Sequence, residues 1–158
     1  MTETSTQPPP ARPRRQRIED TLAMLDRHVD CWVATSHPGS GAPQLVPLSF
    51  VWDGETVLLS TSASSPTGRA LAATGAVRLA FGATRDVVMV DGDVEVLDAV
   101  DLTPEEGDRF AGRTGFDPRT LRTRYLYFRV RPARIQAWRE ENELAARDLM
   151  RDGVWLTD

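Results

Sequence analysis

Two extended runs joined by a tight turn constrain the fold of this chain more than any other feature of its sequence. The run Pro43–Trp52 (PQLVPLSFVW) leads into Asp53-Gly54, and a second run (ETVLLST) follows over residues 55–61. An Asp-Gly pair between two strand-like runs is a strong local signal for a β-hairpin, because both residues tolerate the positive φ angles of a tight turn. The sequence therefore predicts antiparallel β structure at its centre.

The stretch after this hairpin is predicted to begin a helix whose start can hold an anion. Ser65 is the expected cap of a helix over residues 66–73, with Pro66 in its first turn and Gly75 at its end. The unpaired first amides and the dipole of such a helix attract negative charge. Arg69 can add a two-pronged contact if it folds back over the helix start. Hydroxyl donors are available from Thr61, Ser62, Ser64 and Thr67. The alternative is a helix start that binds nothing.

The remaining elements are predicted from hydrophobic periodicity. An amphipathic helix is expected over residues 17–28, where Ile18, Leu22, Leu25 and Val29 recur at helical spacing. Further strands are expected over residues 31–36, 76–82, 86–97 with a bend at Asp91-Gly92, 124–130 and 133–138, the last two separated by Arg131-Pro132. Helices are expected over residues 104–111 and 140–150. Roughly six or seven strands joined mainly by short turns predict a mainly β fold, a closed or nearly closed antiparallel barrel with peripheral helices.

Size and charge narrow the class of protein. The 158 residues suit a single domain over residues 17–158, ending in a C-terminal helix. Residues 1–16 lack apolar periodicity and are expected to form a disordered N-terminal arm. A net charge of −4 argues against nucleic acid as the main partner. The sequence shows no secretion signal and no apolar run approaching roughly 18 residues, so a cytoplasmic protein without membrane contact is expected.

Residues that usually carry catalysis are sparse. The single cysteine, Cys31, excludes an internal disulfide, and its neighbours Trp32 and Val33 indicate a buried strand position rather than a nucleophile. His28 and His37 lack a third ligand at a suitable spacing, so no metal site is expected. The sequence contains no Gly-x-Ser-x-Gly elbow, Walker loop or dinucleotide glycine fingerprint.

Six segments follow the first predicted helix in a characteristic order. They are CWVATS, PQLVPLSFVW, VLLSTSASSPTGRAL, AVRLAF, TRDVVMVDGDVEV and YFRVRPARIQAW. From Ile18 to Trp138 the chain resembles the flavin-binding split barrels related to pyridoxamine 5'-phosphate oxidase, in particular their small actinobacterial branch. The resemblance implies a six-stranded antiparallel split barrel of the FMN-binding type that forms a homodimer. It also implies two molecules of FMN, or of the deazaflavin coenzyme F420, in grooves between the subunits.

The phosphate-binding stretch of that family differs in this chain. The family commonly has Ser or Arg, any residue, Lys, two further residues and Asn-Leu. Ser65 and Leu71 match the first and last positions, whereas Thr67 replaces the lysine and Ala70 the asparagine. Loss of the lysine removes a positive charge, which Arg69 can replace from a neighbouring turn position. Weaker FMN binding, another cofactor and an empty barrel all remain open.

The resemblance also assigns candidate cofactor contacts. The edge of the flavin ring would pass along Val46, Pro47, Leu48 and Ser49. Thr61 and Ser62 would lie near the ribityl chain and the phosphate. Trp138 would either approach the cofactor from the other subunit or pack in the barrel or dimer. The full set of candidate cofactor-binding residues is Val46, Pro47, Leu48, Ser49, Thr61, Ser62, Ser65, Thr67, Arg69 and Trp138.

Three functions follow from this reading. The first is an FMN-dependent oxidoreductase that transfers hydride to or from a small-molecule substrate, which requires no catalytic side chain because the flavin carries the hydride. Its alternative is a deazaflavin (F420)-dependent reductase. The second is a non-enzymatic binder of a flavin, a haem-like group or another planar ligand. The third, action on pyridoxamine phosphate, is disfavoured because residues 151–155 (RDGVW) lack the C-terminal Arg-x-His element of the larger vitamin-processing oxidases.

Overall fold

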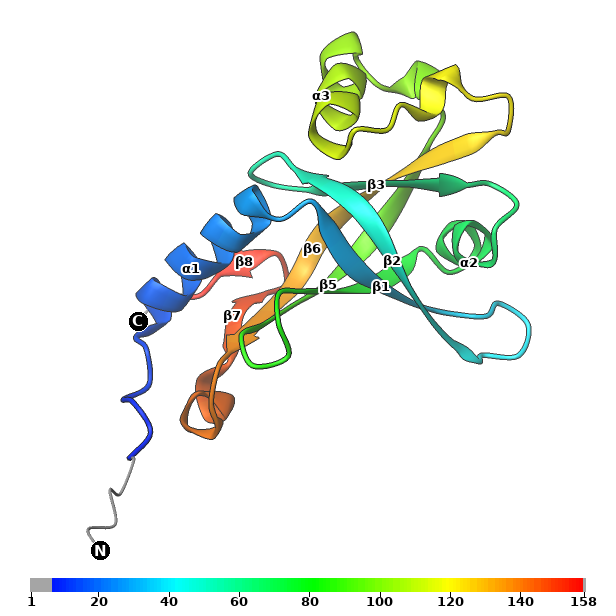
Figure 1. The fold of residues 1–158 in the computed structure, drawn as a ribbon. Coiled ribbons are helices and arrows are strands. Elements are labelled where there is room, and N and C mark those ends of the chain that lie inside the picture. Colours follow the sequence, from blue (N-terminus) through cyan, green and yellow to red (C-terminus); the bar gives the residue numbers. More distant parts are fainter. Residues whose placement is uncertain (1–6, 158) are drawn as a thin grey trace, which may run out of the picture.

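A barrel of antiparallel strands organises the chain in the computed structural model, which describes residues 7–157 (Figure 1). Its strands are β1 (Asp30–Ser36), β2 (Pro43–Trp52), β3 (Val57–Ser62), β4 (Ala76–Phe81), β5 (Val87–Leu97) and β6 (Tyr125–Trp138). They follow the order β3-β2-β1-β4-β5-β6, and pairing of β3 with β6 closes the ring. This is the predicted six-stranded antiparallel split barrel.

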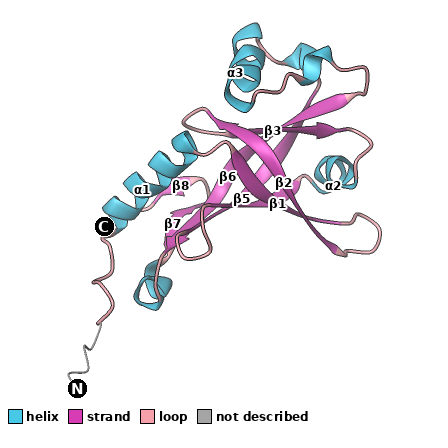
Figure 2. Cartoon of the chain, viewed as in Figure 1, coloured by secondary structure: helices cyan, strands magenta, loops and turns pink. Residues whose placement is uncertain are grey.

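Helices and a short outer hairpin surround the barrel (Figure 2). The α-helices are α1 (Arg14–Arg27), α2 (Pro66–Thr74) and α3 (Pro104–Thr114), and the hairpin consists of β7 (Asp148–Arg151) and β8 (Val154–Trp155). Short 3-10 helices span Ala99–Asp101, Pro118–Thr120 and Glu141–Ala146. No helix within residues 7–157 is long and apolar enough to cross a membrane.

The predicted hairpin between β2 and β3 is confirmed. Asp53 Oδ1 accepts hydrogen bonds from the N–H groups of Glu55 and Thr56 at 2.8 and 2.6 Å, and Gly54 has a φ of 99°. The two strands pair only over Phe50–Trp52 of β2. On its other edge β3 pairs along its whole length with β6, and residues 43–49 of β2 have no ladder to β3.

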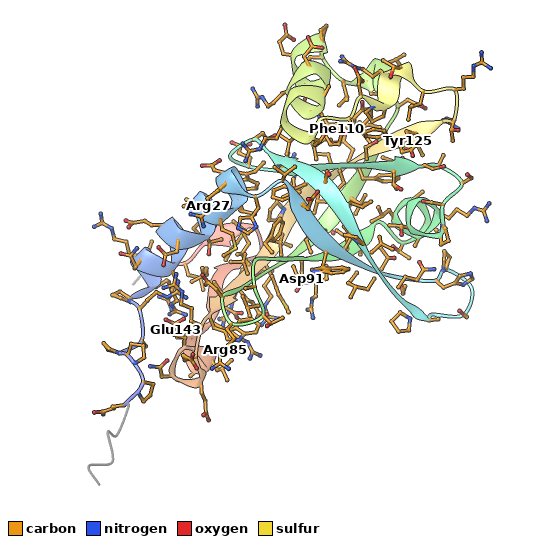
Figure 3. The ribbon with its side chains drawn as sticks, in the orientation of Figure 1. Arg27, Arg85, Asp91, Phe110, Tyr125 and Glu143 are labelled. Carbon is orange, nitrogen blue, oxygen red and sulfur yellow. The ribbon has the colours of Figure 1, made fainter. Side chains whose placement is uncertain are left out.

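Two apolar clusters lie on opposite sides of the barrel wall. Inside the barrel, Phe50 and Phe81 meet edge to face with ring centroids 4.8 Å apart, and α1 adds Leu25 to the same core. Outside it, Phe110 of α3 packs edge to face on Tyr127 at 5.4 Å (Figure 3). Neighbouring residues of a strand point to opposite faces, so the same strands supply both clusters.

The first helix begins earlier than the sequence predicted. α1 starts at Arg14, and ahead of it the guanidinium of Arg12 bonds Glu143 and Asp20. The expected disordered arm is therefore wrong for residues 12–16, because periodicity cannot reveal a partner 131 positions along the chain. Residues 1–6 of that predicted arm lie outside the described residues.

β6 is one continuous strand, so the predicted break at Arg131-Pro132 is wrong. On one edge its pairing with β3 ends at Val130 and its pairing with β7 begins only at Ile135. On the other edge Pro132 lies opposite Gly92, at the predicted bulge of β5. The missing N–H of Pro132 thus falls where the ladder is interrupted, which is where a strand tolerates proline.

The predicted C-terminal helix over residues 140–150 is also wrong. The chain forms only the 3-10 helix Glu141–Ala146 before it continues as β7 and β8. Leu149 of β7 is fully buried, and Asp152 and Gly153 both adopt positive φ angles in the turn to β8. Strand pairing with β6 outweighs the helix propensity of these residues, and the Asp-Gly turn signal was overlooked.

We expect Gly92→Ala to destabilise the barrel. A Cβ at residue 92 would lie 2.6 Å from the Arg131 carbonyl oxygen and 2.6 Å from a Val130 methyl carbon, so the bulge would have to shift. The expected loss is about 1 to 3 kcal/mol of unfolding free energy, measured by urea denaturation. Gly112→Ala is the matched control, because a Cβ there meets nothing within 4 Å in α3 and should stabilise slightly. Equal stability of the two variants would contradict this account of the bulge.

A second prediction concerns Glu143, whose carboxylate clamps the segment before α1. It accepts bonds from Arg12 Nε and Nη2 at 2.9 and 2.8 Å and from the Arg139 N–H at 2.9 Å. The hydrogen bond from Arg12 outweighs the opposing effect of burial and lowers the pKa of Glu143 from 4.5 to about 2. Its stabilisation is therefore complete above about pH 4.5 and is lost as the pH falls through about 2.

Glu143→Gln should accordingly destabilise the protein most at neutral pH. The unfolding free energy of the variant should fall below that of the unmodified protein by an amount that shrinks between pH 5 and 2. The reason is that Glu143 loses its charge over this range, whereas Gln does not titrate. Urea denaturation at several pH values measures this, with exposed Glu141→Gln as the control. A difference that does not change with pH would show that the carboxylate charge is unimportant.

Candidate functional site

A groove opens where β2 separates from β3. On one edge, residues 43–49 of β2 pair with β1, but on the other edge they have no strand partner within the described chain. A groove of about 480 Å³ lies along this second edge, between β2 and the start of α2. β2 contributes Gln44, Leu45, Val46 and Leu48 to its wall, and the opposite wall consists of Thr61, Ser65, Pro66 and Thr67.

The start of α2 is fixed by Ser65, as the sequence predicted. Its hydroxyl accepts a bond from the Gly68 N–H at 2.9 Å and donates to the Ser62 carbonyl at 2.9 Å. It also lies 3.3 Å from Thr61 Oγ1. The hydroxyl of Ser65 is therefore committed to joining the helix to the end of β3, and its contribution to a ligand site is indirect.

Gly68 is a residue that the sequence analysis missed. A Cβ at this position would collide with the Ser62 carbonyl oxygen, so only glycine lets the helix lie this close to β3. The available signal was a glycine inside a predicted helix, which often marks a close approach of two backbones. Gln44 and Leu45 were missed as well, although their position beside Val46 on a predicted strand placed them near the site.

Thr67 provides the hydrogen-bond donors at the start of α2 that the Ser65 cap does not use. Pro66 has no N–H, Gly68 N–H bonds Ser65 Oγ, and Arg69 N–H bonds the Ser65 carbonyl at 3.0 Å. The N–H and hydroxyl of Thr67 have no hydrogen-bond partner in residues 7–157, although the residue is buried. A helix amide and a hydroxyl that both border a groove suit the oxygen atoms of an anion.

None of the described residues that line this groove has a charged side chain. Arg69 is exposed and does not line the groove, and its guanidinium makes no hydrogen bond or ion pair with the described residues. The hydroxyls of Ser62 and Ser64 bond each other at 3.1 Å outside the lining. Any anion in the groove would therefore meet neutral donors, unless Arg69 moves over it.

The predicted β2 residues divide between two faces of the strand. Val46 and Leu48 line the groove together with the predicted Thr61, Ser65 and Thr67. Pro47 lies opposite Trp32 on the exposed face, and Ser49 Oγ donates to Asp30 Oδ1 at 2.6 Å. The alternation of a strand explains why Val46 and Leu48 line the groove and Pro47 and Ser49 do not, whereas Leu45 borders the groove from the outer face of the strand.

Trp138 is remote from the groove of its own chain. Thr61 lies opposite Leu126 at the beginning of β6, whereas Trp138 ends that strand. The intervening residues span about 40 Å of strand at the usual rise per residue. Trp138 instead contacts Arg147, whose guanidinium carbon lies 5.6 Å from the ring centroid.

Cys31 is buried in β1, as the sequence analysis interpreted it. Burial, aided by the charge of Asp30, raises the pKa of its thiol to about 12. A thiol that stays protonated at neutral pH is a poor nucleophile. The structure therefore gives no support to cysteine chemistry.

The architecture, a closed barrel in which one strand parts from its neighbour beside a helix start, is that of a split barrel. A sequence profile of the family described as pyridoxamine 5'-phosphate oxidase matches residues 18–151, and the chain therefore belongs to this family. A comparison with curated proteins finds no match.

Solved structures share the fold at low sequence identity. A protein described as an F420 reductase is 22% identical, with a TM-score of 0.60, over 72% of this chain and 93% of its own. A FAD-binding protein from Mesorhizobium loti is 16% identical, with a TM-score of 0.59, over 74% and 90%. General stress protein 26 from Bacillus anthracis is 14% identical, with a TM-score of 0.55, over 75% and 91%. At these identities the likeness concerns the fold alone.

We expect Ser65→Ala to loosen the start of α2. Removal of the cap hydroxyl leaves the Gly68 N–H without its acceptor and should cost about 0.5 to 2 kcal/mol of unfolding free energy. Chemical denaturation measures this loss. Ser64→Ala is the matched control. Within residues 7–157 the exposed Ser64 hydroxyl bonds only the Ser62 hydroxyl, and the bond from the Ser64 N–H to Ser62 Oγ survives the substitution. An equal effect of the two substitutions would exclude a capping role for Ser65.

Proposed function

We propose that this protein is a flavin-dependent oxidoreductase that binds FMN, or the deazaflavin coenzyme F420, in the groove between β2 and α2. The observation that carries the proposal is the unpaired edge of β2, which faces the uncommitted donors of Thr67 across a groove of about 480 Å³. Such a volume lies within the usual range of roughly 300 to 1,000 Å³ for small-ligand sites.

The residues present fit the two chemically different ends of such a cofactor. Val46 and Leu48 offer apolar contacts to a planar ring, and the backbone edge of β2 offers donors and acceptors to its polar rim. The N–H and hydroxyl of Thr67 fit a phosphate. When bound, the flavin supplies the hydride chemistry, and the chain's residues would bind it, orient it and limit its contact with water.

Two findings bear on the choice between FMN and F420. The solved structures with this fold include proteins described as an F420 reductase and a FAD-binding protein, which supports a flavin-type cofactor. The neutral groove lining favours a cofactor that is held loosely enough to exchange, because charge-assisted bonds to phosphate are the stronger ones. This is the specific reason to retain F420, used as a diffusible substrate, as the alternative.

A homodimer is part of the proposal. Trp32 and Leu45 are 49% and 61% exposed on the outer face of the sheet, and exposed apolar patches of this kind mark contact surfaces. Leu45 also lines the groove, so a second copy packed on this face would border the cofactor. Trp138, remote from its own groove, would then reach a cofactor only from the partner subunit.

Titration with each cofactor tests the proposal. We expect FMN to bind and to remain with the protein through gel filtration, whereas F420 used as a diffusible substrate should bind reversibly and separate from the protein on the column. The protein should elute at the mass of a dimer by light scattering. The bound cofactor should be reduced by a nicotinamide or oxidised by a small-molecule acceptor, whereas a non-enzymatic binder would hold it without turnover. Failure to bind either cofactor at micromolar concentration would overturn the proposal.

Variants at the start of α2 locate the phosphate. If Arg69 closes over it, Arg69→Ala should weaken FMN binding by about 1.5 to 3 kcal/mol, as expected for a charge-assisted hydrogen bond. Thr67→Val keeps the side-chain shape and removes a neutral donor, so it should cost about 0.5 to 1.5 kcal/mol. Arg15→Ala, on exposed helix surface, is the charge-matched control. Unchanged affinity in both variants would place the phosphate elsewhere.

A further inference from the structure

A second cluster of functional side chains lies on β6 and β7, away from the groove. Arg134 binds Asp148 Oδ1 through Nε and Nη2 at 3.0 and 2.9 Å. Arg151 binds Asp148 Oδ2 through the same two nitrogens, each at 2.7 Å. Gln136 Nε2 adds a bond to Oδ1 at 2.7 Å. One carboxylate thus holds two guanidinium groups in fixed positions.

The carboxylate is the buried component of this arrangement. The side chain of Asp148 is 11% exposed, whereas those of Arg134 and Arg151 are 44% and 64% exposed. Burial alone would raise the pKa of Asp148, but the hydrogen bonds from Gln136, Arg151 and Arg134 outweigh it and hold the pKa below its usual value. Asp148 therefore stays ionised at neutral pH and orients the two arginines toward solvent.

A third arginine extends the cluster. The guanidinium of Arg147 lies over the ring of Trp138 and bonds no carboxylate of the described chain. Two hollows adjoin at the cluster and share Arg134 and Asp148 as lining residues. One, of about 410 Å³, also contains Arg151 and exposed Asp152, and the other, of about 330 Å³, contains Arg147.

The charge at this place is opposite to that of the whole chain. Three arginines face two aspartates here, although the chain carries a net charge of −4. Arg134 and Arg151 each bond Asp148 through Nε and Nη2. Their Nη1 groups have no hydrogen-bond partner in residues 7–157. Guanidinium groups that are already oriented lose less entropy on binding a ligand.

We propose that Arg134, Arg147 and Arg151 form a binding site for a small multivalent oxyanion that carries phosphate or carboxylate groups. Planar guanidinium donors match both kinds of oxyanion, and two adjoining hollows suit a ligand with more than one charged group. The site uses neither β2 nor α2 of its own chain. Arg147 adjoins Trp138, which the proposed dimer would bring to the partner's cofactor, whereas Arg134 and Arg151 pair with Asp148 instead. Variants of Arg151 therefore separate a failure of this site from a failure of the cofactor groove.

Calorimetric titration tests the site with two probes, inorganic pyrophosphate and citrate, in metal-free buffer at physiological ionic strength. Arg151→Gln should weaken binding of the preferred probe by at least about tenfold, the effect of one charge-assisted hydrogen bond. Arg147→Gln should also weaken it and leaves the bonds to Asp148 intact. Arg15→Gln is the control, because the Arg15 side chain is 87% exposed and, among the residues that the structure describes, pairs only with Glu19 on α1. A single cooperative thermal unfolding transition well above the titration temperature verifies that each variant is folded; Arg151→Gln can unfold somewhat earlier because it removes two bonds to Asp148.

A nuclear magnetic resonance titration gives a direct second readout. The side-chain Nε–H signals of Arg134 and Arg151 should shift on addition of the preferred probe, and that of Arg15 should not. Preference for pyrophosphate would indicate a phosphorylated ligand, and preference for citrate a polycarboxylate. The proposal is overturned if neither probe binds at millimolar concentration, or if Arg15→Gln reduces affinity as much as Arg151→Gln. FMN titration of the same preparations reports separately on the groove.

Discussion

The pairing of β3 with β6 is the constraint on which the rest of the structure depends. β3 commits one edge to β6 along its whole length and meets β2 at only three residues, Phe50–Trp52. The other part of β2 has β1 on one edge and no strand of the described chain on the other. Backbone groups along that second edge remain available to water or a ligand, because the strand ladder does not use them. The groove lies where this edge faces the start of α2.

Turns, helix ends and the β-bulge were predicted well, because short local sequence signals determine them. Asp53-Gly54 marked the hairpin, Ser65-Pro66 and Gly75 marked the two ends of α2, and Asp91-Gly92 marked the bulge of β5. Each depends on the conformational limits of glycine or proline or on a capping side chain, which neighbouring residues determine. The errors arose where distant residues decide the structure. The continuity of β6 depends on which partners its edges have, and β7 forms because β6 offers it an edge.

The candidate site shows the same division. The sequence indicated which segments meet at the groove, since Val46, Leu48, Thr61 and Thr67 all line it. It could not show that the hydroxyl of Ser65 is used up in the helix cap, or that Gly68 allows α2 to approach β3. The arginine cluster was not predicted, because Arg147 and Asp148 were assigned to a helix over residues 140–150, Arg134 to a separate strand, and Arg151 to the segment after that helix. Only strand geometry brings Arg134 and Arg151 to one carboxylate.

The clamp between Arg12 and Glu143 has a consequence for the synthesis of the protein. The two residues are 131 positions apart, so the arginine leaves the ribosome long before its acceptor has been translated. At usual elongation rates this interval is on the order of ten seconds. Barrel closure through β6 is delayed in the same way, and the early hairpin strands must wait with their apolar faces uncovered. The apolar faces of these strands therefore stay uncovered during synthesis until the last quarter of the sequence, which contains β6, has emerged.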